Sequence, residues 1–230
     1  MQRRPLLLLG AGAFAAPAFA RKPLKAPAET TSNADAASGI RAALERGAEA
    51  AVELLGRKDG FLGNPKVRIE PPGYVKNASK LLRLAGQQKQ IDELVTAMNR
   101  AAEAAVPEAK AMLVTAARSI GIADARRIVT GGDDSVTKFF AGKTRAPLVD
   151  KFLPVVRRET EKVDLAARFN AVSGKAAGMG LLKGKNASIE RHVTEKALDG
   201  LYLMIGEEEK KIRKDPVGTG SALLARVFGR

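Results

Sequence analysis

Three residues near the C-terminus have the types and spacing of a small metal site. His192, Glu195 and Asp199 stand at positions i, i+3 and i+7, so a helix would place one imidazole and two carboxylates on the same face. Such a set could hold a hard divalent metal ion. However, Lys196 lies among them and further basic residues continue the face, as on an ordinary solvated helix surface. We therefore predict no metal and no cofactor.

Glu208 is the acidic residue that the pattern places nearest the core. At about 100° per residue, its side chain points with an apolar stripe of the same predicted helix. The members of this stripe are Val193, Ala197, Leu201, Met204, Ile205 and Ile212. An unpaired buried carboxylate destabilises a fold, so we expect Glu208 to be largely buried and paired with a basic or hydrogen-bonding group. Two interpretations remain open, a structural ion pair and a functional acid.

Asp133 and Asp134 follow the glycine pair Gly131-Gly132. Two carboxylates on a glycine-rich turn could form a cation loop. The alternative is a left-handed glycine that ends one helix and an aspartate that caps the next. We favour this structural interpretation, because helix N-termini attract carboxylates without any ligand.

A basic segment with a small apolar cluster runs from Ser173 to Asn186. It contains four glycines, no acidic residue, three lysines (Lys175, Lys183 and Lys185) and three apolar residues (Met179, Leu181 and Leu182). Such an element could touch a bilayer surface. A plain surface loop is the favoured interpretation, because repeated glycines oppose a persistent amphipathic helix.

The common enzyme signatures are absent from the sequence. There is no GxSxG, HExxH, Walker, GxGxxG or EF-hand pattern, and a single histidine excludes every multi-histidine metal site. The lack of cysteine excludes a disulfide framework and thiolate chemistry.

The first 20 residues have the pattern of a cleaved signal peptide. Arg3 and Arg4 precede an apolar stretch that ends in the small-x-small signal Ala18-Phe19-Ala20. The arginine pair is compatible with both the Tat and the Sec route. We predict a signal peptide over residues 1–20, cleavage after Ala20, a flexible tether over 21–32, and a periplasmic or otherwise exported protein.

The chain is strongly basic. Loss of residues 1–20 removes Arg3 and Arg4 and lowers the formal net charge from +14 to +12. For an exported protein this charge predicts an anionic membrane surface or envelope polymer as partner, and no nucleic acid is expected. The alternative is that the basic residues only keep the domain soluble.

Apolar residues recur at helical spacing through most of residues 33–230, which predicts an all-α fold. Residues 33–56, 88–106 and 188–214 form the longest predicted helices. Pro147 is expected to open a helix, and Pro154 to kink or split it. Residues 60–73 contain three prolines and predict an extended connector lying over the helices. We therefore expect a single multi-helix domain of about 8–10 helices with one Pro-rich connector.

Several blocks of the sequence, in this order and spacing, resemble a known bacterial family. The blocks are residues 33–39, Lys58-Asp59-Gly60-Phe61-Leu62, Asn64-Pro65-Lys66-Val67-Arg68-Ile69, Met98 to Ala109, Gly131-Gly132-Asp133-Asp134, and Thr194 to Arg213. The chain is similar to the family catalogued as domain of unknown function 4197. The resemblance covers nearly all of residues 21–230 and implies an exported helical protein, but it brings no activity.

The sequence is compatible with three classes of function: a binding protein, an enzyme and a structural subunit. We favour a non-enzymatic periplasmic or envelope protein that binds or scaffolds an anionic or apolar, lipid-like partner. The alternatives are a carboxylate-dependent, hydrolase-like periplasmic enzyme that uses acids such as Glu208, or a structural assembly subunit. Convergent buried carboxylates would favour the enzyme, and an apolar groove with a basic rim would favour binding.

Overall fold

The computed structural model describes residues 33–73, 75–76, 82–162, 164–178 and 188–215. All of them belong to the compact unit formed by residues 31–230. The predicted signal peptide and tether lie outside the described residues. The described part of the chain is all-α and contains no strand, as the sequence predicts.

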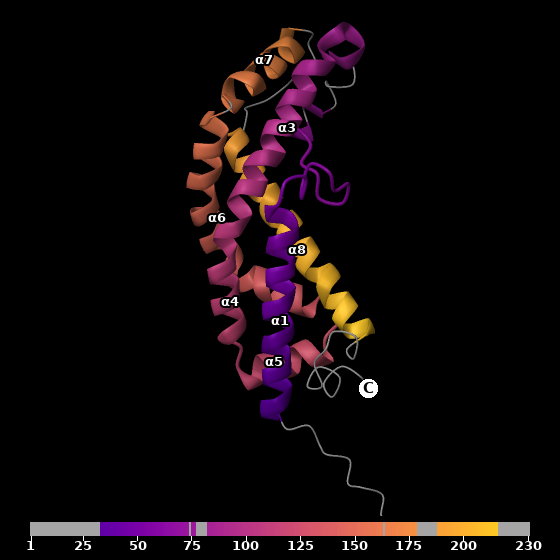
Figure 1. The fold of residues 1–230 in the computed structure, drawn as a ribbon, viewed down its shortest axis with the longest axis vertical. Coiled ribbons are helices and arrows are strands. Elements are labelled where there is room, and N and C mark those ends of the chain that lie inside the picture. The colour runs from indigo at the N-terminus through magenta and orange to yellow at the C-terminus, as the bar shows by residue number, and fades with distance from the viewer. Residues whose placement is uncertain (1–32, 74, 77–81, 163, 179–187, 216–230) are drawn as a thin grey trace, which may run out of the picture. The chain divides into compact units, whose positions relative to one another are not determined.

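The longer helices supply most of the architecture (Figure 1). In chain order, the helical elements are α1 (Asn33–Gly56), η1 (Arg83–Gln87), α3 (Gln88–Ala105), η2 (Val106–Ala109), α4 (Lys110–Arg118), α5 (Ile122–Thr130), α6 (Ser135–Lys162), α7 (Leu165–Gly178) and α8 (Ile189–Lys214). The helices α6 and α1 both pack against α8, and α3 packs against α6 and α7. Their inward-facing residues form one continuous apolar core. No described helix is both long and apolar enough to cross a membrane.

The Pro-rich connector after α1 lies on the helices, as expected, but its first half is a series of hydrogen-bonded turns and not the predicted extended segment. Phe61 is fully buried and packs on α8 at Gly200, where a Cβ would come within 2.8 Å of the Phe61 ring. Val67 packs on the same glycine. Gly60 is equally constrained, because a Cβ there would lie 2.5 Å from the backbone oxygens of Leu54 and Leu55. The connector is therefore a packed part of the core surface.

Contrary to the prediction, Pro147 does not open a helix and Pro154 does not split one. The structure has one helix from Ser135 to Lys162, with Pro147 and Pro154 inside it. Both prolines are exposed. A proline has no N–H to donate to the carbonyl four residues earlier, and here these carbonyls are on the solvated side of the helix. Seven of the eight buried residues, all except Val155, recur every fourth position: Val136, Phe140, Thr144, Leu148, Phe152, Val156 and Thr160. Because this period exceeds 3.6, the buried face winds around α6 and meets successive partners.

The interpretation of residues 173–186 as a plain surface loop is wrong for residues 173–178, because α7 continues to Gly178. Ser173 is buried and Gly174 is exposed. A single exposed glycine weakens a helix by only about 1 kcal/mol, which the packing of α7 against α3 and α6 offsets.

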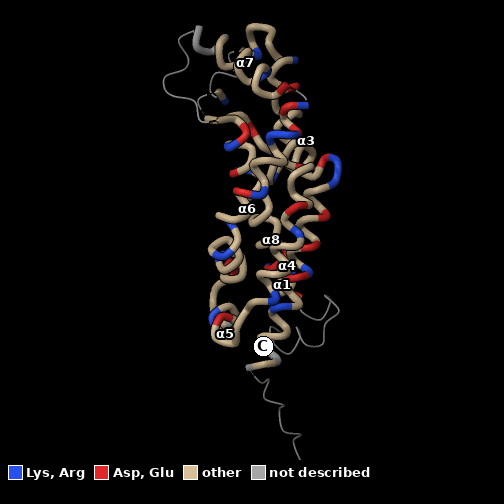
Figure 2. Tube along the Cα trace, turned by 90° about the vertical axis from the view of Figure 1, so that its left-hand side faces the viewer, with Lys and Arg blue, Asp and Glu red and all other residues tan. Residues whose placement is uncertain are grey.

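Charged residues of both signs alternate over the described surface (Figure 2). Many form ion pairs between neighbouring elements, such as Lys66 with Glu207 at 2.6 Å and Arg145 with Asp199 at 2.6 Å. Exposed pairs of this kind contribute little to stability.

Candidate functional site

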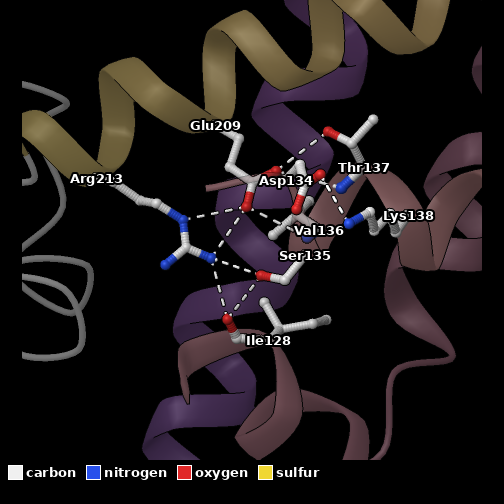
Figure 3. Close-up of polar contacts among 8 residues, drawn as sticks. All are labelled: Ile128, Asp134, Ser135, Val136, Thr137, Lys138, Glu209 and Arg213. Atoms are coloured by element: carbon white, nitrogen blue, oxygen red, sulfur yellow. Dashed lines mark hydrogen bonds and ion pairs between the residues drawn. The ribbon is translucent and has the colours of Figure 1, made fainter. Parts of the chain in front are cut away.

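The carboxylate of Glu209 is buried against the first turn of α6 (Figure 3). Its side chain is 4% exposed. The backbone N–H of Val136 donates to Oε1 at 3.2 Å, and the backbone N–H and hydroxyl of Thr137 donate to Oε2 at 3.2 and 3.1 Å. The first N–H groups of a helix have no partner within it and carry partial positive charge, which stabilises an anion. Glu209 therefore caps α6 from a different helix.

Arg213, one turn further along α8, pairs with this carboxylate (Figure 3). Its Nε and Nη2 donate to Oε1 of Glu209 at 3.1 and 2.9 Å. Nη2 also donates to the backbone carbonyl of Ile128 at 3.0 Å and to the hydroxyl of Ser135 at 2.9 Å. The Ser135 hydroxyl donates to the same carbonyl at 2.9 Å. This network joins α5, α6 and α8.

A small hollow lies beside the network, between α1, α6 and α8. It measures about 20 Å³ and is lined by Ile40, Ala43, Leu44, Gly47, Val136, Ile205, Glu209, Ile212 and Arg213. This is about the volume that one water molecule requires. The hollow is too small for a substrate, so the geometry around Glu209 indicates a structural role.

Glu208 is not the buried carboxylate that the helical-wheel argument predicts. Its side chain is 21% exposed and therefore only partly buried, but the predicted basic partner is present, because its carboxylate forms an ion pair with Lys211 at 2.6 Å. The Cβ of Glu208 faces α1, because a Cβ added at Gly47 would lie 3.6 Å from it. The prediction failed by one residue because α8 packs on both α1 and α6, so its buried face is wider than the apolar stripe. Glu209 falls on the side that faces the start of α6.

Neither Asp133 nor Asp134 supplies the side-chain cap of α6. The carboxylate of Asp134 pairs with Lys138 at 2.9 Å, and this hydrogen bond lowers the pKa of Asp134; Asp133 is exposed. The preceding Gly131 has an extended backbone rather than the expected left-handed one. A glycine is needed there because a Cβ would lie 2.8 Å from the carbonyl oxygen of Arg127. The turn therefore shows a structural arrangement, with its capping acid supplied by α8.

Glu103 on α3 is the second buried carboxylate among the described residues. Its Oε1 accepts hydrogen bonds from the backbone N–H groups of Phe61 and Leu62, both at 3.1 Å. Its Oε2 accepts from Arg100 at 2.5 Å, and this hydrogen bond raises the pKa of Arg100. Arg100 also binds Asp59 at 2.8 Å. Glu103 thereby holds the first half of the connector on α3.

Asn99, on the same helix, holds the second half of the connector. Its Oδ1 accepts from the backbone N–H of Ile69 at 2.8 Å, and its Nδ2 donates to the carbonyl of Ile69 at 2.9 Å. Nδ2 also donates to the carbonyl of Val95 at 2.8 Å. The fully buried amide therefore satisfies both backbone polar groups of Ile69.

The face of His192, Glu195 and Asp199 does not form a metal site in the described part of the chain. The Nε2 of His192 lies 2.9 Å from the carbonyl oxygen of Glu70, and burial lowers the pKa of the imidazole. Glu195 pairs with Arg191, and Asp199 pairs with Arg145 and Lys196. Each member is engaged with a different partner.

The basic segment after α7 falls largely outside the described residues. Lys183 and Lys185 lie in residues 179–187, which the structure does not describe. The backbone of Lys175 belongs to α7. The membrane-contact interpretation of these three lysines remains a prediction.

A groove between α4 and α6 is much larger than the hollow beside Glu209. It has a volume of about 470 Å³ and is lined by Ala111, Met112, Thr115, Ala116, Ser119, Lys143, Thr144 and Lys151. Sites for small molecules commonly measure about 300–1,000 Å³. Met112 and Ala116 are half-buried and packed on the core, so the floor is apolar.

The groove is positively charged. Its lining includes two lysines and no carboxylate, and neither lysine forms an ion pair with a described residue. The ammonium nitrogen of Lys143 instead lies over the ring of Phe139, 6.0 Å from the ring centre. The hydroxyls of Thr115, Ser119 and Thr144 are engaged with carbonyls of their own helices. The two ammonium groups are therefore the strong donors that the groove presents.

Sequence reasoning did not single out Lys143 and Lys151. They are eight residues apart, and a groove between two helices depends on how α4 and α6 pack. One signal was present: the short α4 segment from Ala111 to Ala117 is rich in small residues, which leave space beside a partner helix.

The described chain is an all-α protein. It has an open groove with an apolar floor and two lysines in its lining, on a core whose helices are joined by buried hydrogen-bond networks. The chain belongs to the family described as "Protein of unknown function (DUF4197)", whose model matches residues 30–229. No curated protein and no solved structure matches the chain.

Three of the family-like blocks meet at the connector. Block 58–62 supplies the N–H groups that Glu103 binds, block 64–69 supplies the Ile69 backbone, and block 98–109 supplies Asn99, Arg100 and Glu103. The resemblance noted in the sequence therefore includes a coherent structural element, the attachment of the connector to α3.

Proposed function

We propose that this chain is a non-enzymatic binding protein of the cell envelope that takes an anionic amphiphile into the groove between α4 and α6. The observation that carries the proposal is the groove lining. An apolar floor favours an alkyl chain, and two lysines without an ion-pair partner among the described residues favour a negatively charged headgroup. Lys143 and Lys151 are about 12 Å apart along the helix axis, so an extended ligand can lie along the groove.

A carboxylate-dependent enzyme has less support. Glu103 and Glu209 already accept hydrogen bonds from backbone N–H groups and from an arginine. A carboxylate engaged in this way has little capacity left to transfer protons or attack a substrate. We therefore assign both to the stability of the fold.

Charge reversal in the groove tests the proposal. We expect Lys143→Glu/Lys151→Glu to weaken binding of monomeric dodecyl phosphate at least about tenfold, because each substitution replaces an attractive charge with a repulsive one. The affinity is measured by isothermal titration calorimetry at low and high salt. Dodecanol, which has the same chain and no charge, should bind more weakly than dodecyl phosphate.

The matched control is Lys58→Glu/Lys214→Glu, which makes the same change in net charge at exposed positions outside the groove. This double variant should retain most of the affinity. Equal losses in the two double variants, or equal binding of dodecanol and dodecyl phosphate, would exclude a charge-selective groove.

The envelope location is part of the same proposal and rests on the predicted signal peptide. We expect the mature protein to begin at Arg21, because Ala18-Phe19-Ala20 is the small-x-small cleavage pattern. N-terminal sequencing of the protein from fractionated cells checks this. A mature pool that starts at Met1 would contradict export by cleavage.

A further inference from the structure

The turn that leads into α3 exposes a large apolar side chain. Leu84 is 86% exposed, compared with 49% for Ile122 and 44% for Leu203, the other exposed large hydrophobic residues of the described chain. It lies in η1, which directly precedes α3. Gly86 has a φ of 78°, and a Cβ there would meet no atom within 4 Å. The glycine is therefore required by the backbone of the turn, which holds Leu84 away from the core.

The residues that neighbour Leu84 in the sequence are basic or uncharged. Arg83 and Lys89 flank it, and residues 83–91 include no acidic residue. The next acid along the chain is Asp92, which pairs with Arg83 at 3.0 Å and accepts a hydrogen bond from Gln88 at 2.6 Å. Lys89 is exposed and forms no ion pair with a described residue. An exposed leucine beside such a lysine resembles the apolar and basic pairing of surfaces that contact anionic lipids.

The neighbouring helix adds no repulsive charge. The helix α7 packs against α3, and both reach the same end of the helical array as η1 (Figure 1). The sequence of α7 contains no acidic residue, and its exposed positions include Ala166, Ala167, Asn170, Ala171 and Gly174. An anionic surface could therefore approach this end without meeting a carboxylate of α7.

We infer that this end of the molecule contacts an anionic bilayer, with Leu84 inserted among the lipid headgroups and Lys89 close to the phosphates. This surface is separate from the α4–α6 groove. It shares with the proposed function only the expectation of an envelope location. A single leucine and a few charges give weak, reversible attachment that falls as salt increases.

The absence of tryptophan from the chain allows a direct test. In the Leu84→Trp variant the introduced indole is the sole tryptophan, so its fluorescence reports the environment of position 84 alone. We expect its emission to shift to the blue with phosphatidylglycerol–phosphatidylcholine vesicles, and the shift to disappear with pure phosphatidylcholine or at high salt. Binding through another segment, such as apolar residues 5–19, would leave this signal unchanged and would contradict the inference.

The matched controls are Leu203→Trp and Ile122→Trp, at exposed apolar positions on α8 and α5. Neither should respond to vesicles. Leu84→Ser should leave the melting temperature unchanged and lower vesicle partitioning about tenfold, because the leucine is exposed in the free protein and is buried only in the lipid.

Two results would overturn the inference. One is an emission maximum of the Leu84→Trp variant that stays unshifted in anionic vesicles, and the other is an equal shift in the Leu203→Trp variant. Neither outcome would affect the dodecyl phosphate experiment, which uses a soluble monomer.

Discussion

Replacement of Glu209 by alanine is expected to lower the free energy of unfolding by about 3–5 kcal/mol, the usual cost of breaking a buried ion pair. The change removes the acceptor of the Val136 and Thr137 N–H groups. It also leaves the guanidinium of Arg213, 16% exposed, without its carboxylate. Urea unfolding followed by circular dichroism measures the effect.

Two further variants make this prediction specific. Glu209→Gln keeps the shape and one oxygen acceptor, so it should cost less than alanine. Glu208→Ala removes only the more exposed pair with Lys211, which should contribute no more than about 1 kcal/mol. A larger loss for Glu208→Ala than for Glu209→Ala would show that the network in Figure 3 does not stabilise α6.

Asn99→Ala should lower the free energy of unfolding by about 2–4 kcal/mol, because a buried donor or acceptor left without a partner costs about 1–3 kcal/mol. The variant removes both hydrogen bonds to the backbone of buried Ile69. The connector should then detach more readily from α3. Urea unfolding measures the global loss, and hydrogen exchange at the Ile69 amide measures the local one.

Asn64→Ala is the control within the same connector. Its side chain accepts one exposed hydrogen bond from the N–H of Lys66, so its removal should change stability by less than about 1 kcal/mol. Unchanged exchange of the Ile69 amide in Asn99→Ala would contradict the proposed attachment.

The long helices could be predicted because their apolar period is local information. The predicted ranges 33–56, 88–106 and 188–214 agree closely with α1, α3 and α8. The same reasoning failed for α6. A proline normally ends a helix, but here both prolines are on the exposed side, where the unserved carbonyls can be hydrated. Which side of α6 is exposed depends on α3, α4 and α8.

Candidate site residues were harder to predict than helices. The sequence indicated that the end of α8 holds an acid against the core, but it placed that acid at Glu208. A helical wheel identifies a single apolar face, whereas α8 packs against both α1 and α6. Glu209 is buried because its carboxylate accepts hydrogen bonds from the N–H groups at the start of α6. Likewise, the glycine–aspartate turn correctly indicated the start of a helix, while the carboxylate that caps it comes from a residue 73 positions later than Val136.

The sequence by itself determined the all-α class, the positions of the main helices, the basic charge and the resemblance to a family, because each depends on residue type and short-range spacing. Only the tertiary structure decided which acids are buried, how Asn99 and Glu103 hold the connector, and where Lys143 and Lys151 meet the apolar residues of α4. These features depend on contacts between segments far apart in the chain. Such contacts are set by how the helices pack together, which no local pattern specifies.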